Sequence, residues 1–321
     1  MKTLYELETL AKLKEPIGIA LGTFDGLHIG HQKVIGDLVA SCKANGYKSV
    51  VYTFSNHPRE LTRNGHKVPK LINNEDKEKF IEETGADYLL MIPFDEKFMK
   101  TDAESFVKKY LMDGMNVKLV AVGFDYRFGK GAEGDVDLLK KLAPKYGYEM
   151  IVTSPVSLAG HKISSSEIRD KIKHGNMEVA RLMLGRPFSV TGEVIKGKQV
   201  GRQLGFPTAN IVTTPHMNLI KPGVYVSYTQ LGNRLYPSLC NVGFNPTFQQ
   251  VELNIESYLL DFDEDIYGEV IRIFFIAHIR NEEKFNSLED LIIRMNGDLA
   301  YAQSDYFDKF TSEDFQIRLT E

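Results

Sequence analysis

Short apolar runs alternate with amphipathic stretches along the first half of the chain. The apolar runs are IGIALG, SVVYTF, DYLLMIPF, VKLVAVGF and YEMIV, and the intervening segments, such as VIGDLVASCKANG, have helical spacing. Strands that alternate with helices pair in parallel, and a strand that is apolar nearly throughout is covered by helices on both faces of its sheet. The pattern over residues 16–153 therefore predicts a doubly wound α/β domain.

The pattern changes near residue 185. Residues 164–184 predict two helices separated by Gly175 and Asn176. The segments that follow are rich in β-branched and aromatic residues, and most are separated by turn residues: FSVTGEVI, GVYVSYTQ, RLYPSLCNVG, LNIESYLLDF and EVIRIFFIAHI. Consecutive strands without helices predict an antiparallel barrel. We therefore predict one domain over residues 1–184 and a second over residues 185–321.

A last amphipathic segment, SLEDLIIRMNGDLAYAQSDYF, predicts a helix at the end of the second domain. One helical face carries Leu288, Leu291, Ile292, Met295 and Leu299. We expect this face to pack against the barrel.

Composition and charge narrow the possible partners. The 321 residues carry a formal charge of -4, and the isoelectric point near 6.1 gives no overall reason to bind nucleic acid. Only Cys42 and Cys240 are present, which favours neither a disulfide framework nor a thiolate zinc site and fits a reducing cytoplasm. The amino terminus lacks the apolar stretch of a signal peptide, and no apolar run is long enough to span a bilayer. We expect a cytoplasmic protein that acts on small molecules, away from membranes; an oligomer is possible but not readable from the sequence.

The first predicted strand leads directly into a glycine-rich turn and the start of a helix, GTFDGLHIGH, residues 22–31. Glycines let the backbone approach a phosphate, and a helix N-terminus attracts an anion. The imidazoles of His28 and His31 can donate hydrogen bonds to phosphoryl oxygens. Zinc is an alternative, although His-x-x-His supplies only two ligands. The other alternative is a structural turn in which the histidine is simply hydrogen-bonded. The combination of glycines, two histidines and a helix start favours a phosphate site.

Two further segments of the first half are candidates. GFDYRFGKG follows another strand and is expected to line the same crevice; Gly129, Gly131 and Gly134 satisfy G-x-G-x-x-G but lie too far beyond the strand for a dinucleotide-binding turn. The segment SSSEIR opens a helix at Ser164. Its hydroxyls and Arg169 are suited to a triphosphate, whereas Ser164 and Glu167 have the spacing of a structural capping box.

Three segments of the second half carry possible chemistry. GEVIKGK matches the phosphate-loop pattern except that Gln199 follows it where Ser or Thr binds magnesium, and we regard this match as accidental. In GRQLGFPTAN, Thr208 and Asn210 are hard oxygen donors suited to Mg²⁺ with phosphate, or parts of a Pro-Thr-Ala-Asn turn. Glu256 lies in an apolar strand, either as a base or as an outward-facing residue.

Taken in order, these motifs resemble those of the bacterial bifunctional riboflavin kinase and FAD synthetase family, along essentially the whole chain. GTFDGLHIGH, TFSNHP, GFDYRFGKG and KISSSEIR resemble the adenylyltransferase half, and GRQLGFPTAN, NVGFNPTF, IESYLLDFDEDIYGE and RNEEKF resemble the kinase half. The resemblance implies an N-terminal nucleotidyltransferase-like, Rossmann-like domain. It also implies a six-stranded antiparallel β-barrel of the riboflavin kinase type with a terminal helix.

The same resemblance implies two reactions that need ATP and Mg²⁺. The C-terminal domain would transfer the γ-phosphoryl group of ATP to riboflavin, giving FMN. The N-terminal domain would let the FMN phosphate attack the α-phosphorus of a second ATP, giving FAD and pyrophosphate. No covalent enzyme intermediate is implied, so catalysis would rest on positioning and charge stabilisation.

Site residues in the adenylyltransferase half follow from the resemblance. His28 and His31 would be catalytic and would stabilise the ATP phosphates. The ATP site would also include Gly22, Phe24, Asp25, Gly26, Ser165, Ser166 and Arg169. Nucleotide or flavin would lie near Asn56, His57, Pro58, Asp125 and Arg127.

In the kinase half, the resemblance implies that Glu256 takes the hydroxyl proton of riboflavin. Thr208 and Asn210 would hold Mg²⁺ with ATP. The ATP and flavin site would comprise these two residues together with Gly201, Arg202, Gly205, Phe206 and Pro207.

Several positions depart from the family pattern. The common Pro-His-Pro is Asn56-His57-Pro58 here, ISSTxIR is ISSSEIR, Tyr258 stands where His is frequent, and the loop after NPTF reads QQVELN without the usual glycine. The changes in the kinase half leave open a monofunctional FAD synthetase with an inactive barrel. A non-enzymatic flavin-binding regulator or chaperone is the other alternative, although simple binding would not need His28, His31 and Glu256.

Overall fold

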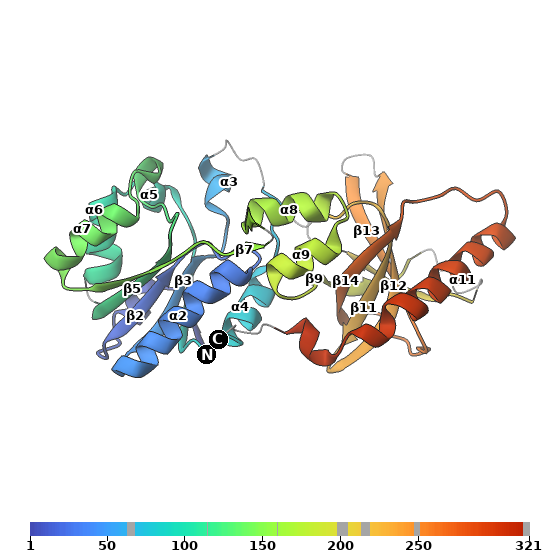
Figure 1. The fold of residues 1–321 in the computed structure, drawn as a ribbon, viewed down its shortest axis with the longest axis horizontal. Helices are drawn as coiled ribbons and strands as arrows, with labels where there is room; N and C mark the ends of the chain where they lie inside the picture. Colours follow the sequence, from blue (N-terminus) through green and yellow to red (C-terminus); the bar gives the residue numbers. More distant parts are fainter. Residues whose placement is uncertain are drawn as a thin grey trace. The chain divides into compact units, whose positions relative to one another are not determined.

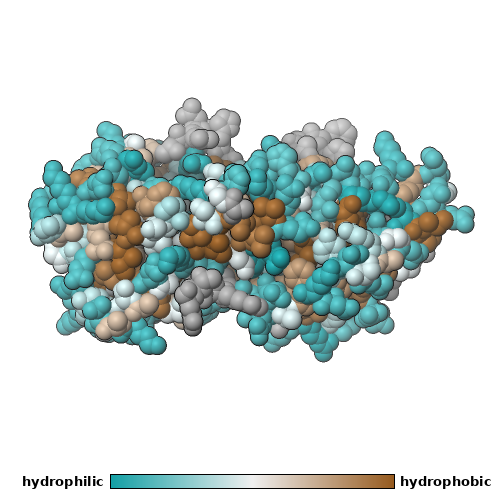
Figure 2. Space-filling view, viewed as in Figure 1, coloured by the Kyte–Doolittle hydropathy of each residue, from teal (hydrophilic) through white to brown (hydrophobic). Residues whose placement is uncertain are grey.

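The computed structural model describes residues 1–62, 68–113, 115–158, 160–197, 205–212, 219–246 and 251–316. These residues form two compact units, one over residues 1–165 and one over residues 166–316. Each unit is described separately below, with elements labelled as in Figure 1. The face in Figure 2 is mostly hydrophilic, with hydrophobic patches between the polar side chains.

A six-stranded sheet forms the centre of the first unit. Its order is β1-β4-β3-β2-β5-β6, and every neighbouring pair is parallel. The strands are β1 (Lys2–Leu4), β2 (Ile17–Leu21), β3 (Lys48–Phe54), β4 (Tyr88–Ile92), β5 (Val117–Gly123) and β6 (Glu149–Thr153). The predicted parallel sheet is confirmed. β1 was not predicted, because three residues are too few to display a period.

Helices cover both faces of this sheet. They are α1 (Leu7–Leu10), α2 (Ile29–Asn45), α3 (Pro58–Thr62), α4 (Asn74–Glu82), α5 (Glu96–Met99), α6 (Ala103–Phe106), a π-helical segment (Val107–Met112) and α7 (Val136–Tyr146). Ile17, Ile19 and Leu21 of β2 belong to one buried cluster, and Ala20 belongs to the other, with α2. This two-sided burial explains why the strands are apolar nearly throughout.

The second unit is a closed antiparallel barrel with strand order β10-β13-β12-β11-β14-β9, so the predicted six-stranded barrel is confirmed (Figure 1). The strands are β9 (Phe188–Ile195), β10 (Thr208–Val212), β11 (Gly223–Leu231), β12 (Arg234–Pro246), β13 (Val251–Leu259) and β14 (Val270–Arg280). α8 (Ser165–Lys173) and α9 (Met177–Leu184) precede it and break at Gly175 and Asn176, as predicted. A small hairpin, β7 (Ser157–Leu158) and β8 (His161–Lys162), comes before α8.

The Pro-Thr-Ala-Asn turn considered for residues 207–210 is not a turn, because Thr208 begins strand β10. Residues 208–212 pair with β13 on one side, and Asn210 and Ile211 pair with β9 on the other. Without this strand the barrel would not close. This strand was not predicted, because it has only five residues and follows glycines and a proline.

Hydroxyl groups fill part of the barrel interior. Ser227, Thr229, Ser238 and Ser257 are fully buried and bond to one another, with oxygen separations of 2.7 to 3.0 Å. Buried polar groups are tolerated when they have such partners. This network links three adjacent strands of the barrel.

The terminal helix α11 (Leu288–Asp305) contacts the barrel through its second half. Ala302 is fully buried in a cluster with Val226, Tyr228 and Phe315, and Leu299 packs at its edge. Leu288 is exposed, so the predicted five-residue packing face is only partly correct. Leu291, Ile292 and Met295 are half-buried, and Figure 2 shows hydrophobic surface over the first turns of the helix, at the right-hand end. Two short 3-10 helices follow, Phe307–Lys309 and Ser312–Phe315.

Candidate active sites

The strand order places three predicted motifs at one edge of the parallel sheet. β2 pairs with β3 on one side and with β5 on the other. The chain therefore adds β3 and β4 on one side of β2, and then β5 and β6 on the other side. Ligands of doubly wound sheets bind at such a switch point, outside the carboxyl ends of the strands. The segments GTFDGLHIGH, SNHP and GFDYRFGKG begin at the carboxyl ends of β2, β3 and β5. Sequences far apart are thereby brought to one edge.

The turn from β2 to α2 has an unusual backbone. Phe24, Gly26 and Leu27 have φ values of 47°, 78° and 41°, in the left-handed region that non-glycine residues rarely adopt. Phe24 and Leu27 are buried in the core, and this burial holds the strained conformation. Asp25 is also buried, and its Oδ1 accepts a hydrogen bond from the Leu71 amide at 3.0 Å. Phe24 and Asp25 therefore shape the turn.

His28 and His31 lie together at the start of α2. Their rings stack with centroids 3.6 Å apart, and Phe24 meets the His31 ring edge-on at 5.3 Å. His28 is the N-cap of α2, since its Nδ1 accepts the His31 amide at 3.3 Å. A neutral imidazole that accepts through Nδ1 carries its proton on Nε2 and can donate from there.

His31 is held in its neutral form. Burial lowers the pKa of His31 well below its ordinary value, and the neighbouring His28 and Lys77 lower it further. Its Nδ1 is buried without a hydrogen-bond partner among the described residues. A neutral imidazole at this position can donate one hydrogen bond to a phosphate oxygen without being tied to a carboxylate.

Lys77 is a site residue that sequence reasoning missed. It lies on α4, is 6% exposed, and donates from Nζ to the Thr23 carbonyl at 3.2 Å and to the Phe54 carbonyl at 3.1 Å. These carbonyls belong to the turn after β2 and to the end of β3. The amphipathic pattern of NNEDKEKFIE gave no signal, because a lysine in such a helix is ordinarily exposed.

The predicted triphosphate segment meets the turn at Ser165. Ser165 Oγ donates to the Asp25 carbonyl at 2.9 Å, which joins ISSSEIR to GTFDG across 140 positions of sequence. Ser166 and Arg169 follow on α8, in the second compact unit; Ser166 is exposed and Arg169 is half-buried. The capping box of Ser164 with Glu167 stays a prediction.

Asn56 has a structural contact. Its side-chain amide donates to the Phe94 carbonyl at 2.9 Å, and its Oδ1 accepts the Phe94 amide at 2.7 Å, so it joins the chain beyond β3 to the chain beyond β4. His57 Nδ1 accepts the Arg59 amide at 3.1 Å, and Pro58 begins α3. These residues lie at the sheet edge where the sequence placed them, and their binding role stays a prediction.

The segment after β5 carries two exposed ion pairs. Asp125 pairs with Lys162 at 2.6 Å, and Arg127 pairs with Asp135 at 3.4 Å. Both acidic and basic partners remain accessible to a ligand. In the G-x-G-x-x-G match, Gly129 and Gly134 lie against Ala103, so the space that a Cβ would fill is taken by protein atoms and is not open to a phosphate.

In the second unit, polar side chains gather on the outer face of three adjacent strands. Glu256 of β13 lies directly opposite Asn210 of β10 and opposite Asn241 of β12. Residues opposite each other in an antiparallel pair point to the same face. Glu256 Oε1 also accepts from Asn254 Nδ2 at 2.7 Å. Glu256 therefore faces outward within a polar cluster, and its role as a base stays a prediction.

Thr208 joins this face through Asn210. The Asn210 amide lies 3.4 Å from Thr208 Oγ1, and a Cβ at Gly197 would collide with Asn210, so this glycine makes room for it. Phe206 is buried and packs edge-on against Tyr258 at 5.2 Å, with Gly205 and Pro207 exposed beside it. Gly201 and Arg202 lie outside the described residues. Gly192–Ile195 of GEVIKGK belong to strand β9, which is not phosphate-loop geometry.

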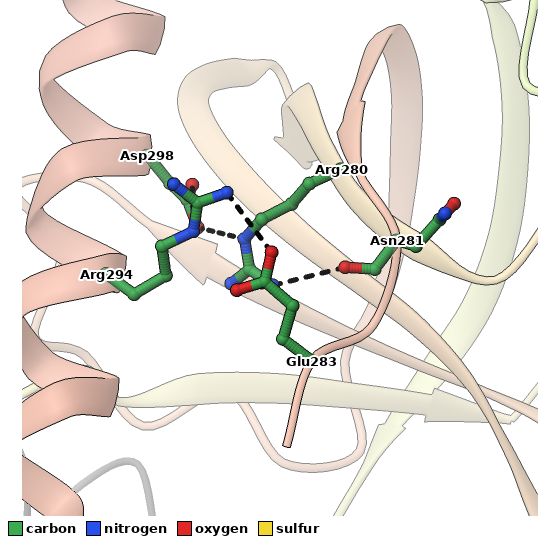
Figure 3. A network of polar contacts seen from close by, with 5 residues as sticks. All are labelled: Arg280, Asn281, Glu283, Arg294 and Asp298. Carbon is green, nitrogen blue, oxygen red and sulfur yellow. Dashed lines mark hydrogen bonds and ion pairs between the residues drawn. The ribbon is translucent and has the colours of Figure 1, made fainter. Parts of the chain in front are cut away.

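The segment after β14 is fixed by the ion-pair network in Figure 3. Arg280 Nε donates to Asp298 Oδ2 of α11 at 2.8 Å, and Arg294 donates to Glu283 at 3.3 Å. A Cβ at Gly243 would collide with Glu282, so the anchored segment lies against β12 beside the Glu256 face. The network thus connects α11 to the polar face of the barrel.

We expect Asp298→Asn to destabilise the protein by about 1–3 kcal/mol, because Arg280 would lose its charged acceptor at a site where both side chains are nearly buried. Urea unfolding followed by circular dichroism measures the change. Glu96→Gln is the matched control, since its pair with Lys100 is exposed and should leave the unfolding midpoint unchanged. Equal midpoints for Asp298→Asn and the wild type would contradict the prediction.

Comparison with known proteins assigns both halves of the chain. The FAD synthetase family model matches residues 10–167, and the riboflavin kinase family model matches residues 184–305. The bifunctional riboflavin kinase/FMN adenylyltransferase of Buchnera aphidicola is 34% identical over 93% of this chain and 97% of its own length. The chain belongs to this family.

A second relative of the same name and a solved structure are also similar to this chain. The Escherichia coli protein of that name is 34% identical over 91% of this chain and 93% of its own. A solved structure titled a macrolide-efflux protein from Streptococcus pneumoniae has a TM-score of 0.86 and 28% identity, over 95% of this chain and 99% of that one. That likeness extends the shared fold over nearly the whole chain.

Within the ranges that the structure describes, no helix is both long enough and apolar enough to cross a membrane. In the same ranges, no three His, Cys, Asp or Glu side chains come together as metal ligands, so His28 and His31 have no third ligand there. The structure adds three candidate site residues that the sequence did not predict: Lys77, Asn241 and Asn254.

Proposed function

We propose that the chain makes FAD from riboflavin in two reactions at two sites. The barrel phosphorylates riboflavin with ATP to give FMN, and the parallel-sheet domain adenylylates FMN with a second ATP, releasing pyrophosphate. The observation that carries this proposal is that each family-matched half holds its own polar cluster, His28 with His31 in one and Glu256 with Asn210 in the other. We propose a functional boundary between residues 184 and 185, which is supported by the start of the riboflavin kinase match at residue 184.

In FAD formation, an FMN phosphate oxygen attacks the α-phosphorus of ATP and pyrophosphate leaves. His28 and His31 donate hydrogen bonds to the phosphate oxygens, where negative charge increases in the transition state. Gly22 and Gly26 let the turn fold tightly beside the triphosphate, since a Cβ would collide with Phe24 at one and with Leu71 at the other. Ser165, Ser166 and Arg169 hold the triphosphate. Asp125 and Arg127 bind the nucleotide or flavin, beside Asn56, His57 and Pro58.

In FMN formation, Glu256 takes the proton of the ribityl hydroxyl as its oxygen attacks the γ-phosphorus of ATP. Asn254 orients the carboxylate through its bond to Oε1. Thr208 and Asn210 are hard oxygen donors on the same outer face, which fits Mg²⁺. The ion would neutralise charge on the ATP phosphates. Tyr258, against which the buried Phe206 packs, offers aromatic surface to substrate, with Gly201, Arg202, Gly205 and Pro207 completing the ATP and flavin site.

The location follows from the substrates and the thiols. ATP is the co-substrate of both reactions, and Cys42 and Cys240 are buried free thiols. Burial raises the pKa of Cys42 to about 11, which keeps it protonated and unreactive. We therefore place the enzyme in the reducing cytoplasm.

Product analysis tests both activities. Purified protein receives ATP and Mg²⁺ with riboflavin in one reaction and with FMN in another, and the flavins are separated chromatographically over time. We expect FMN and then FAD from riboflavin, and FAD from FMN. FAD from FMN with riboflavin unchanged would leave a monofunctional synthetase. No turnover in either reaction, with flavin still bound, would favour a flavin-binding regulator.

A further inference from the structure

Lys77 is a buried cation beneath the phosphate-binding turn. Its Nζ donates to two backbone carbonyls, Thr23 and Phe54, and it makes no ion pair with any carboxylate in the described part of the chain. Thr53 Oγ1 donates to the same Thr23 carbonyl at 2.9 Å. Burying a charged group is costly unless it is paired and hydrogen-bonded, and Lys77 has only neutral carbonyl acceptors among the residues that the structure describes. It lies at the carboxyl ends of β2 and β3, where a ligand of the sheet would bind.

The groups around Lys77 are mostly cationic. Asp25 in the turn favours its charge, and Lys70, in the segment before α4, opposes it. Lys70 itself donates to the Ser55 carbonyl at 3.2 Å, beside the end of β3. His28 and His31 face the same turn from α2, and Lys77 acts electrostatically on His31. One carboxylate against two ammonium groups leaves positive charge at this edge, which suits an anionic ligand.

We propose that Lys77 is a positioning residue for FAD formation, holding the carbonyls of Thr23 and Phe54 so that the turn presents His28 and His31 to the ATP phosphates. It has a second effect through charge. Burial is the main cause of the lowered pKa of His31, and the Lys77 cation adds to it, so that His31 acts as a hydrogen-bond donor and does not bind a proton from solvent. The inference rests on the proposed adenylyltransferase function and adds a residue on α4 to it.

The positive charge of Lys77 itself depends on pH. Burial lowers the pKa of Lys77 to about 8, with Asp25 opposing and Lys70 reinforcing the shift. Lys77 is therefore charged below that value and neutral above it. Above it the edge loses positive charge that attracts the ATP phosphates, so we expect FAD formation to fall as the pH rises through about 8, while FMN formation by the same molecule lacks this inflection.

Lys77→Met tests the proposal against Lys79→Met, an exposed lysine on the same helix. In Lys77→Met we expect kcat for FAD formation to fall roughly tenfold, less than for loss of a direct donor, and the inflection near pH 8 to disappear. The His31 imidazole, titrated by NMR without substrate, should have a higher pKa than in the wild type. Lys79→Met should change none of these, and the riboflavin kinase rate should be unchanged in both variants.

Three outcomes would overturn the proposal. Wild-type FAD formation that shows no alkaline fall at any pH at which the protein stays folded would do so without any variant, even if Lys77→Met does not fold. Unchanged kinetics in Lys77→Met would do so as well. Lower stability with an unshifted His31 titration would make Lys77 a structural residue only. Because the titration needs no substrate, it distinguishes failure of this inference from absence of FAD synthesis.

Discussion

His28→Ala lowers the rate of FAD formation from FMN by roughly a hundredfold or more, the loss expected when one preorganised hydrogen-bond donor is removed. The ring of His28 lies in stacking contact with His31, and its Nδ1 already accepts the His31 amide, so Nε2 is the donor that the substitution removes. FMN formation from riboflavin should be unchanged, because Glu256 and its partners belong to the other compact unit. Separate assays with FMN and with riboflavin measure the two rates.

A control is needed because His28 is also the N-cap of α2. Loss of a cap costs about 1 kcal/mol of stability by itself. His28→Asn retains a capping oxygen and lacks the imidazole, so it should keep the unfolding midpoint near that of the wild type while FAD formation remains low. If His28→Asn made FAD at the wild-type rate, capping would be the whole role of His28. If both activities fell together in a folded variant, the two sites would not be independent.

The sequence predicted the phosphate turn because its residues are consecutive. Strand, glycines, two histidines and helix start all lie within residues 17–31, so local chemistry was sufficient. Ser165 was predicted from its own motif, and the fold adds its bond to Asp25. Lys77 could not be predicted, because its role arises from two carbonyls that are distant in sequence, and helix periodicity carries no information on such contacts.

The barrel shows more clearly what the hydrophobic pattern of a sequence cannot predict. Alternation could not decide whether Glu256 is a base or only an outward-facing residue, because both roles place it on the same face; the strand pairing adds Asn210 and Asn241 as its neighbours there. β10 was missed because its five residues follow a glycine- and proline-containing segment. The face of α11 was predicted from spacing, but spacing does not reveal how much of a helix lies against its neighbour, and Leu288 is exposed.

Glu256→Gln slows riboflavin phosphorylation by roughly a hundredfold to ten-thousandfold, the range expected when a general base is lost. The substitution preserves shape and leaves an oxygen that can accept from Asn254, so the site should keep its geometry and lose only its proton acceptor. KM for riboflavin should therefore change little while kcat falls. FAD formation from supplied FMN should continue at the wild-type rate. Initial rates with riboflavin and with FMN measure both effects.

Glu264→Gln is the matched control for Glu256→Gln, because Glu264 is an exposed barrel carboxylate whose pair with Arg234 lies at the surface. It should leave both activities unchanged. An unchanged kinase rate in Glu256→Gln would remove Glu256 from the mechanism. A rise in KM for riboflavin with kcat preserved would instead make it a binding residue, since removal of an interaction made equally in ground and transition states changes KM alone. The expected fall in kcat is what distinguishes a base on this outer face from a polar residue that merely faces solvent.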